Sequence, residues 1–211
     1  MATTADMKIL NVYILLILLS FSFQQKHIPK IQIYIESLCP DCYFFITQSF
    51  KNFYENIKNP NLAEIELIPY GNAKEMYNTQ SNKWEFTCQH GELECYGNLI
   101  ETCAIQKMGR VNSYSTIICI ESYIEEYNYD FDKTLDFCMD DKTILAEIKE
   151  CVSSDEGNFY QHQMAQKTDE NHYWVPWVLV DGVHDINIEN KIIKSLTDYL
   201  CGEDKSKCYG D

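Results

Sequence analysis

The chain has 211 residues, and its 17 lysines and arginines stand against 32 aspartates and glutamates, for a formal net charge of -15. A surface this acidic repels phosphate backbones, so the composition argues against nucleic-acid binding. The roughly 190 residues that follow an apolar leader suit one domain with an insertion, residues 24–211, better than two independent domains.

The leader is typical of a secretory signal peptide. Residues 9–23 are almost wholly apolar, Lys8 precedes them, and Ser20 and Ser22 offer small side chains for cleavage. The strongly apolar part runs for about 12 to 15 residues, whereas a membrane span needs roughly 20. We therefore expect cleavage of residues 1–23 and no stable membrane association afterwards. In a chain that enters the secretory route, ten cysteines predict disulfide bonds.

The first elements after the leader are predicted to be a strand, a helix and a second strand. Residues 31–36 and 63–70 alternate with a period of two, which is typical of strands with one buried face. Between them, residues 43–58 have apolar side chains at helical spacing, and Asn59-Pro60 ends the helix. The predicted inner face of this helix consists of Phe44, Phe45, Phe50, Phe53, Tyr54 and Ile57. This order of elements implies a parallel strand pair joined by a crossover.

Residues 71–167 are predicted to form a helical, cysteine-rich insertion. They contain six of the ten cysteines, and helices are expected at 98–108, 115–127 and 143–151. Sheet character then returns at 177–180, Asp181-Gly182 supplies a hairpin turn, and a strand over 183–188 follows. A helix over 192–200 closes the chain. The fold class is therefore α/β.

The segment ESLCPDCY, residues 36–43, places Cys39 and Cys42 directly after the first strand. A structural zinc site needs four ligands, but the chain has no second C-x-x-C and no histidine pair at three-to-five spacing, so no metal site is expected. An inert bridge would close a small ring and stabilise little. Cys39 instead falls at a helix start, with Pro40 at the first helical position, where free N–H groups and the helix dipole favour a thiolate. The motif therefore predicts a redox dithiol in which Cys39 attacks and Cys42 resolves.

Two further features bear on this dithiol. Asp41 shares the helix start and should raise the Cys39 pKa, although an ordinary acidic residue of a first helical turn fits the position equally well. Enzymes of the thioredoxin fold have a cis-proline before the strand beside the active-site helix. The C-P-D-C motif at the end of the first strand resembles the active site of such enzymes. This resemblance implies that Pro176 is cis and places the Val175 backbone beside Cys39, where an extended substrate could pair with it. The alternative is a proline that merely starts an edge strand.

The stretch CQHGELECYGNLIETC resembles the signature of the gamma-interferon-inducible lysosomal thiol reductase family, C-Q-H-G-x-x-E-C-x-x-N-x-x-x-x-C. Its fixed positions are Cys88, Gln89, His90, Gly91, Glu94, Cys95, Asn98 and Cys103. The segments CPDC, LIPYGNA and VPWVLVDG, together with Cys201 and Cys208, extend the likeness over nearly all of the mature chain.

The resemblance implies a thiol reductase of endosomes and lysosomes with a thioredoxin-like core, which reduces disulfide bonds of protein substrates. It implies no cofactor, only an external thiol reductant as electron donor. Two alternatives stay open: an oxidase or isomerase of the same fold, and a non-catalytic, disulfide-stapled secreted binding protein. An exposed thiol of low pKa at Cys39 would favour the enzyme. The chain has no Asn-x-Ser/Thr sequon, so secretion, or a lysosomal route that uses no N-linked sugar, also stays open.

The roles of the signature residues follow from the resemblance as well. His90 could carry protons or could hold the fold, and we favour the structural role. Glu94 and Asn98 are expected to be structural in the same way. The signature cysteines are expected to be bridged, and the one pairing that we predict is Cys201 with Cys208.

Overall fold

The computed structural model describes residues 27–57, 59, 62–202 and 206–209, so the expected signal peptide lies outside the described residues. Its central sheet has four strands in the order β2-β1-β5-β6. They are β1 (Lys30–Ile35), β2 (Glu64–Pro69), β5 (Trp177–Val180) and β6 (Val183–His184). β1 pairs with β2 in parallel and with β5 in antiparallel fashion. The predicted parallel pair is confirmed, and the fold is α/β with a thioredoxin-like core.

The helical segment after β1 begins at Pro40, the first helical position predicted from the C-P-D-C motif, and so before the apolar spacing that starts at residue 43. It comprises α2 (Pro40–Phe44), a π-helical stretch (Phe45–Phe50) and α3 (Lys51–Asn56). Phe45 and Phe50 are buried in the main core, as predicted, but Phe44 is 61% exposed. The π-helical stretch has a different number of residues per turn from an α-helix, so the buried face is rotated relative to the predicted one. The placement of Phe44 on the inner face was therefore wrong.

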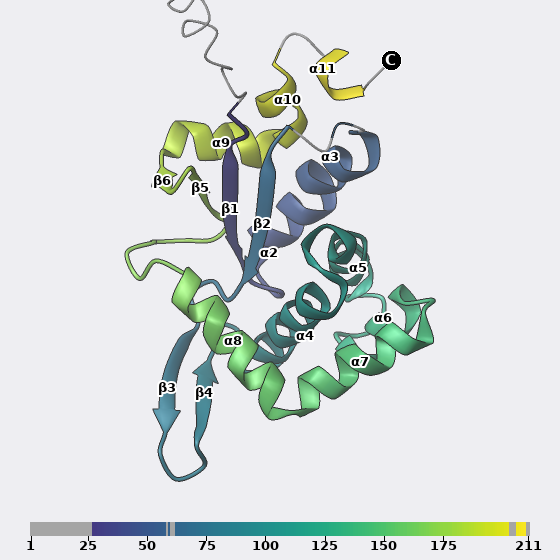
Figure 1. Ribbon diagram of the computed structural model, residues 1–211, viewed down its shortest axis with the longest axis vertical. Helices are drawn as coiled ribbons and strands as arrows, with labels where there is room; N and C mark the ends of the chain where they lie inside the picture. Colours follow the sequence, from purple (N-terminus) through teal and green to yellow (C-terminus); the bar gives the residue numbers. More distant parts are fainter. Residues whose placement is uncertain (1–26, 58, 60–61, 203–205, 210–211) are drawn as a thin grey trace, which may run out of the picture.

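The chain between β2 and β5 holds the cysteine-rich region, which extends below the sheet in Figure 1. Its elements are β3 (Lys74–Asn78), β4 (Lys83–Thr87), α4 (Glu92–Met108), α5 (Arg110–Tyr123), α6 (Phe131–Cys138), α7 (Lys142–Ser153) and α8 (Asp155–Lys167). The three expected helices are present as α4, α5 and α7. The β3–β4 hairpin and the helices α6 and α8 were not predicted. All side chains of the hairpin's two strands are at least partly exposed, and β3 (KEMYN) has no apolar alternation, although Trp84 and Phe86 alternate with polar residues in the short β4 (KWEFT).

Two disulfides and a second hydrophobic core hold this helical region together. Cys103–Cys151 links α4 to α7, and Cys119–Cys138 joins α5 to the end of α6. The core consists largely of Ile100, Ile120, Phe131, Leu135 and Ile148. No helix in the described part of the chain combines the length and the apolarity needed to cross a bilayer. The disulfide-rich helical region expected from the sequence is therefore present, with a hairpin at its start.

The end of the chain differs from the prediction at two caps. The strand expected over 183–188 stops at His184, because Asp185 accepts hydrogen bonds from the N–H groups of two following residues and starts α9 (Ile186–Lys194). The single helix expected over 192–200 is interrupted at Ser195, whose hydroxyl caps α10 (Leu196–Cys201). Both residues are strong N-cap formers.

The last described element is α11 (Ser206–Tyr209), which is tied to α10 by the Cys201–Cys208 disulfide. This bridge confirms the one pairing predicted from the sequence. Both cysteines are buried, and together with Leu62 they form a small separate cluster.

Candidate active site

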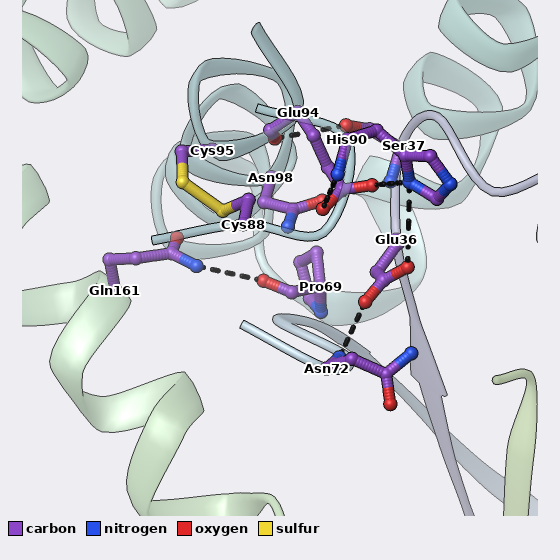
Figure 2. The surroundings of a disulfide bond; sticks show 10 residues. All are labelled: Glu36, Ser37, Pro69, Asn72, Cys88, His90, Glu94, Cys95, Asn98 and Gln161. Atoms are coloured by element: carbon purple, nitrogen blue, oxygen red, sulfur yellow. Dashed lines mark hydrogen bonds and ion pairs between the residues drawn. A yellow bond between two sulfur atoms is a disulfide. The ribbon is translucent and has the colours of Figure 1, made fainter. Parts of the chain in front are cut away.

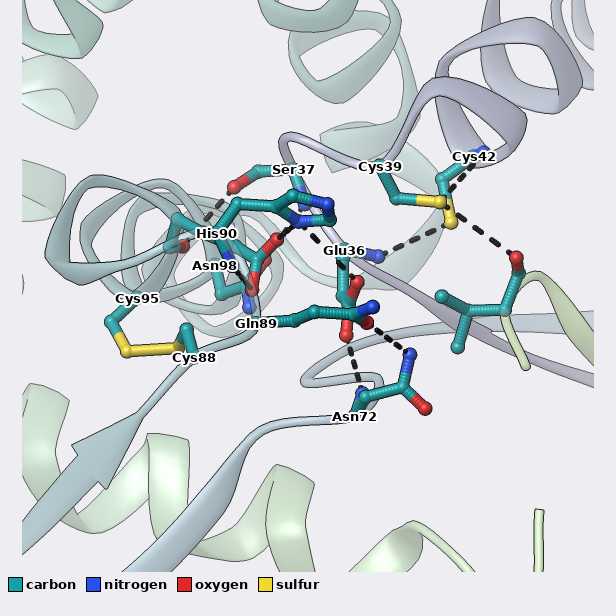
Figure 3. Close-up of polar contacts among 12 residues, drawn as sticks. Glu36, Ser37, Cys39, Cys42, Asn72, Cys88, Gln89, His90, Cys95 and Asn98 are labelled. Atoms are coloured by element: carbon teal, nitrogen blue, oxygen red, sulfur yellow. Dashed lines mark hydrogen bonds and ion pairs between the residues drawn. A yellow bond between two sulfur atoms is a disulfide. The ribbon is translucent and has the colours of Figure 1, made fainter. Parts of the chain in front are cut away.

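The two cysteines of the C-P-D-C motif lie where β1 leads into α2. Cys39 is the N-terminal cap of the helix, and Pro40 is its first residue. The Sγ of Cys39 accepts a hydrogen bond from the backbone N–H of Cys42 at 3.5 Å, one of the donors that a helix start leaves unpaired. Cys39 and Cys42 are free thiols, whereas the other eight cysteines form four disulfides. Figure 3 shows the two sulfur atoms close together at the start of the helix.

The two thiols differ in acidity. The pKa of Cys39 is lowered to about 6, chiefly by a hydrogen bond with the Cys42 side chain and further by the backbone N–H groups of Cys42 and Asp41. Burial and the negative charge of Asp41 act in the opposite direction. The pKa of Cys42 is raised, first by burial and then by its hydrogen bond with Cys39. Cys39 is therefore the better nucleophile of the pair, and Cys42 keeps its proton.

The segment before β5 contacts the first cysteine. The Val175–Pro176 peptide bond is cis, and the carbonyl oxygen of Val175 lies 3.7 Å from the Sγ of Cys39. β5 itself pairs with β1, so the sheet fixes the position of this segment relative to the motif. The fold thus brings together two predicted parts of the site that are 136 residues apart in the chain.

A cavity of about 400 Å³ opens beside Cys39. Its apolar and aromatic lining consists of Leu38, Pro40, Tyr43, Phe44, Ile124 and Tyr129, and it is joined by His90, Glu121 and Glu125. Cys39 is only 8% exposed, so it is more enclosed than the exposed thiol expected of an enzyme. Its side chain lines this cavity.

The signature segment packs against the loop between β1 and the motif. The Cys88–Cys95 disulfide ties the turn before α4 to the first turns of that helix, and Gly91 has the positive φ of 88° that the turn requires. From α4, Asn98 Oδ1 accepts the backbone N–H of Ser37 at 2.9 Å, and the carbonyl of Glu94 accepts the Ser37 hydroxyl at 3.1 Å. Figure 2 shows these side chains converging on the loop. Cys103, by contrast, lies in the second core and is bridged to α7.

His90 joins the signature to the end of β1. Its Nδ1 contacts Glu94 Oε2 and lies 3.9 Å from Glu36 Oε2. Its pKa is raised, chiefly by the hydrogen bond to Glu94, with smaller contributions from the charges of Glu36 and Cys39. Gln89 accepts a hydrogen bond from the Asn72 side chain at 2.8 Å, and so ties the signature to the loop after β2.

Comparison with known proteins agrees with this arrangement. The family described as Gamma interferon inducible lysosomal thiol reductase (GILT) matches residues 30–142, which include the C-P-D-C motif and the whole signature. The chain belongs to this family. Curated relatives include the gamma-interferon-inducible lysosomal thiol reductase of Carassius auratus, which is 36% identical over 84% of this chain and 71% of its own length. The mouse protein of the same name is 36% identical over 72% of this chain and 60% of its own length. A thiol reductase-like protein of Anopheles gambiae is 32% identical over 85% and 78% of the two chains.

Membership of the GILT family makes the chain a thiol reductase, and its four disulfides fit the secretory pathway. One residue of this GILT site, Glu36, was not predicted from the sequence. Glu36 is 1% exposed, and burial raises its pKa to about 7. Its Oε1 accepts the backbone N–H of Asn72, and its own backbone N–H points to the Sγ of Cys42 at 3.4 Å. The only signal in the sequence was a charged residue at the end of an otherwise buried strand.

A second group that the sequence analysis missed lies in the helical region of this GILT protein. Glu101 of α4 and Glu121 of α5 are buried, and Glu121 lines the cavity beside Cys39. Burial raises the pKa of both carboxyls, and that of Glu101 is raised to about 8. At least one of the two therefore keeps its proton at neutral pH. Nothing in their local sequence context marks them as buried acids.

Proposed function

We propose that this chain reduces disulfide bonds of protein substrates through the Cys39–Cys42 dithiol, in an acidic endosomal or lysosomal compartment or after secretion. The observation that carries the proposal is the position of the Cys39 sulfur, which accepts a backbone hydrogen bond at the helix N-terminus and lies against the Val175 carbonyl. A bridge kept only for stability would need neither a low pKa nor an adjoining cavity.

In the first step, the Cys39 thiolate attacks one sulfur of a substrate disulfide. A mixed disulfide forms, and the other substrate sulfur leaves as a thiolate that takes a proton from solvent. The cis segment at Val175–Pro176 leaves backbone groups beside Cys39 with which an extended substrate can pair. The cavity lined by Tyr43 and Phe44 accepts apolar side chains next to the substrate cysteine.

In the second step, Cys42 loses its proton and attacks the Cys39 sulfur of the mixed disulfide. This displaces the second substrate thiol and leaves a Cys39–Cys42 disulfide. The substrate has then gained two electrons and two protons. An external thiol reductant returns them to the protein, so the cycle requires no bound cofactor.

The lowered pKa of Cys39 suits reaction in an acidic compartment. A thiol with the ordinary pKa of about 8.5 is ionised to roughly 3 parts in 10,000 at pH 5. With a pKa of about 6, Cys39 would be ionised to roughly one part in ten, an increase of about 300-fold. Lower intrinsic nucleophilicity offsets part of this gain. Asp41 acts against it, since its negative charge raises the Cys39 pKa.

Trapping at pH 5 tests the proposal. Cys42→Ser removes the resolving thiol and should accumulate mixed disulfides with a denatured, disulfide-containing protein, each formed through Cys39. The matched variant Cys39→Ser should form none. If Cys42→Ser forms no adducts and the unmodified protein does not reduce the same substrate, the proposal is wrong and a non-catalytic binding role takes its place. Equilibration with a glutathione buffer measures the reduction potential and distinguishes a reductase from an oxidase or isomerase.

A further inference from the structure

Three potential metal ligands from separate segments meet beside the dithiol. Glu36 follows β1, His90 lies in the turn before α4, and Glu94 belongs to the first turn of α4. One ligand atom from each lies within 4.8 Å of the other two, and they are the one such group of three among the described residues. Figure 3 shows Glu36 and His90 directed toward each other.

One oxygen in this group is buried and has no hydrogen-bond partner. Glu36 Oε2 is buried in a side chain with 0% exposure, and it lies 3.9 Å from His90 Nδ1. The second oxygens of both carboxylates are held by backbone donors, Glu36 Oε1 by Asn72 N–H and Glu94 Oε1 by His90 N–H. Asn72 therefore fixes Glu36 from outside the cluster, the His90 backbone fixes Glu94 from within it, and the inward oxygen of Glu36 has no hydrogen-bond partner. Ligands whose second oxygens are oriented by hydrogen bonds in this way are typical of metal sites.

The charges of the cluster favour a divalent cation. Two ionised carboxylates around one imidazole carry a charge of minus two, or minus one when the imidazole is protonated. A divalent ion bound to two carboxylates and a neutral imidazole makes the group neutral. Both carboxylate side chains are fully buried, whereas the His90 side chain is 39% exposed and provides a route for entry.

We propose that Glu36, His90 and Glu94 form a Zn²⁺ site. Zinc binds one nitrogen and two oxygen ligands of this kind, whereas calcium and magnesium prefer oxygen ligands alone. Three protein ligands with one position left open is the arrangement of a non-structural zinc site. No metal site was expected from the sequence, because the chain lacks a suitable cysteine set and a closely spaced histidine pair, and these ligands lie up to 58 residues apart along the chain (Glu36 to Glu94).

Bound zinc would affect the thiol chemistry. His90 and Cys39 line the same cavity, so an ion held by His90 would share that cavity with the reacting sulfur, and a thiolate is a strong zinc ligand. Zinc would therefore lower the reactivity of Cys39 and hold the reductase inactive until the metal is removed. This regulatory part rests on the proposed function, whereas the metal site itself does not.

Zinc titration by calorimetry at pH 7 tests the site. The titration uses the full chain with Cys39→Ser and Cys42→Ser, so that the dithiol contributes no ligand. We expect one Zn²⁺ per chain, and an affinity at least about tenfold lower when either Glu36→Gln or His90→Gln is added. The matched control is His162→Gln, because His162 also contacts a carboxylate, and that of Glu75 is the one carboxylate it pairs with among the residues that the structure describes. Circular dichroism melting of each variant verifies folding.

Absence of zinc binding in the thiol-free chain would overturn the site, and so would equal affinity in folded His90→Gln and His162→Gln variants. Alkylation at pH 7 tests the regulation separately, with both thiols present. One equivalent of zinc should slow the alkylation of Cys39 several-fold, and His90→Gln should remove most of this protection. Equal protection in His90→Gln would mean that the dithiol alone binds the metal, and the regulatory part would be wrong. Neither titration nor alkylation requires turnover, so a failure of the proposed function would be recognised separately.

Discussion

Replacing Gly71 by alanine perturbs the active site from the loop after β2. Gly71 has a φ of +55°, and a Cβ added there would lie 2.2 Å from Cγ of Glu36 and 2.6 Å from its Oε1. Real Cβ atoms do not approach other atoms this closely, so either the loop or Glu36 must move. Glu36 cannot move freely, because it is buried and its carboxylate is bound to Asn72.

Two costs add in this variant. Alanine in the left-handed region costs about 1–2 kcal/mol of folding free energy. Crowding a packed interior costs about 1–3 kcal/mol more. Gly182 serves as a control that separates the backbone cost from the crowding cost, because its φ is +78° but no atom lies within 4 Å of an added Cβ. Gly182→Ala should therefore show the backbone cost alone, and Gly71→Ala should lose about 2–5 kcal/mol in total.

Urea unfolding with the disulfides intact measures both variants. We expect Gly71→Ala to be destabilised by about 1–3 kcal/mol more than Gly182→Ala, with similar slopes against urea. Equal destabilisation would refute the close packing of Glu36 against the loop, and with it our description of how the end of β1 is fixed.

Two further predictions concern buried polar groups. Asn98→Ala leaves the buried N–H of Ser37 without its acceptor and should lower the free energy of unfolding in urea by about 1–3 kcal/mol. The control Asn112→Ala, at an exposed position, should change it by less than about 0.5 kcal/mol. Similar values for the two variants would contradict the role of Asn98. Because burial raises the pKa of Glu101 from 4.5 to about 8, the folded state binds this proton more tightly than the unfolded chain, and stability should fall as pH rises from 4.5 toward 8. One such group lowers the free energy of unfolding by up to about 1.4 kcal/mol per pH unit, and Glu101→Gln should reduce this slope. An unchanged slope of unfolding free energy against pH would show that Glu101 is not the group responsible.

The sequence predicts the elements whose signals are local. The alternation over 31–36 identifies β1, and the C-P-D-C spacing identifies the start of α2, because strand burial and helix capping depend on adjacent residues. The parallel pairing of β1 with β2 follows from the order of elements and chain chirality.

The missed features depend on residues far apart in the chain. Glu36 is buried because Gly71, Asn72 and His90 close around it, and no pattern near position 36 encodes that contact. The β3–β4 hairpin was missed because all the side chains of its two short strands are at least partly exposed. The Asp185 cap was missed because the apolar alternation that continues beyond it is compatible with both a strand and a helix.

The pH dependence of Cys39 alkylation tests the central claim most directly. Iodoacetamide labelling of the reduced protein between pH 4 and 9, with Cys39 and Cys42 resolved by peptide mass spectrometry, gives the ionisation curve of each thiol. We predict a midpoint near pH 6 for Cys39, no midpoint for Cys42 in this range, and a higher Cys39 midpoint in Cys42→Ala, which removes the main hydrogen bond. A Cys39 midpoint at the ordinary thiol value of about 8.5 would contradict the account.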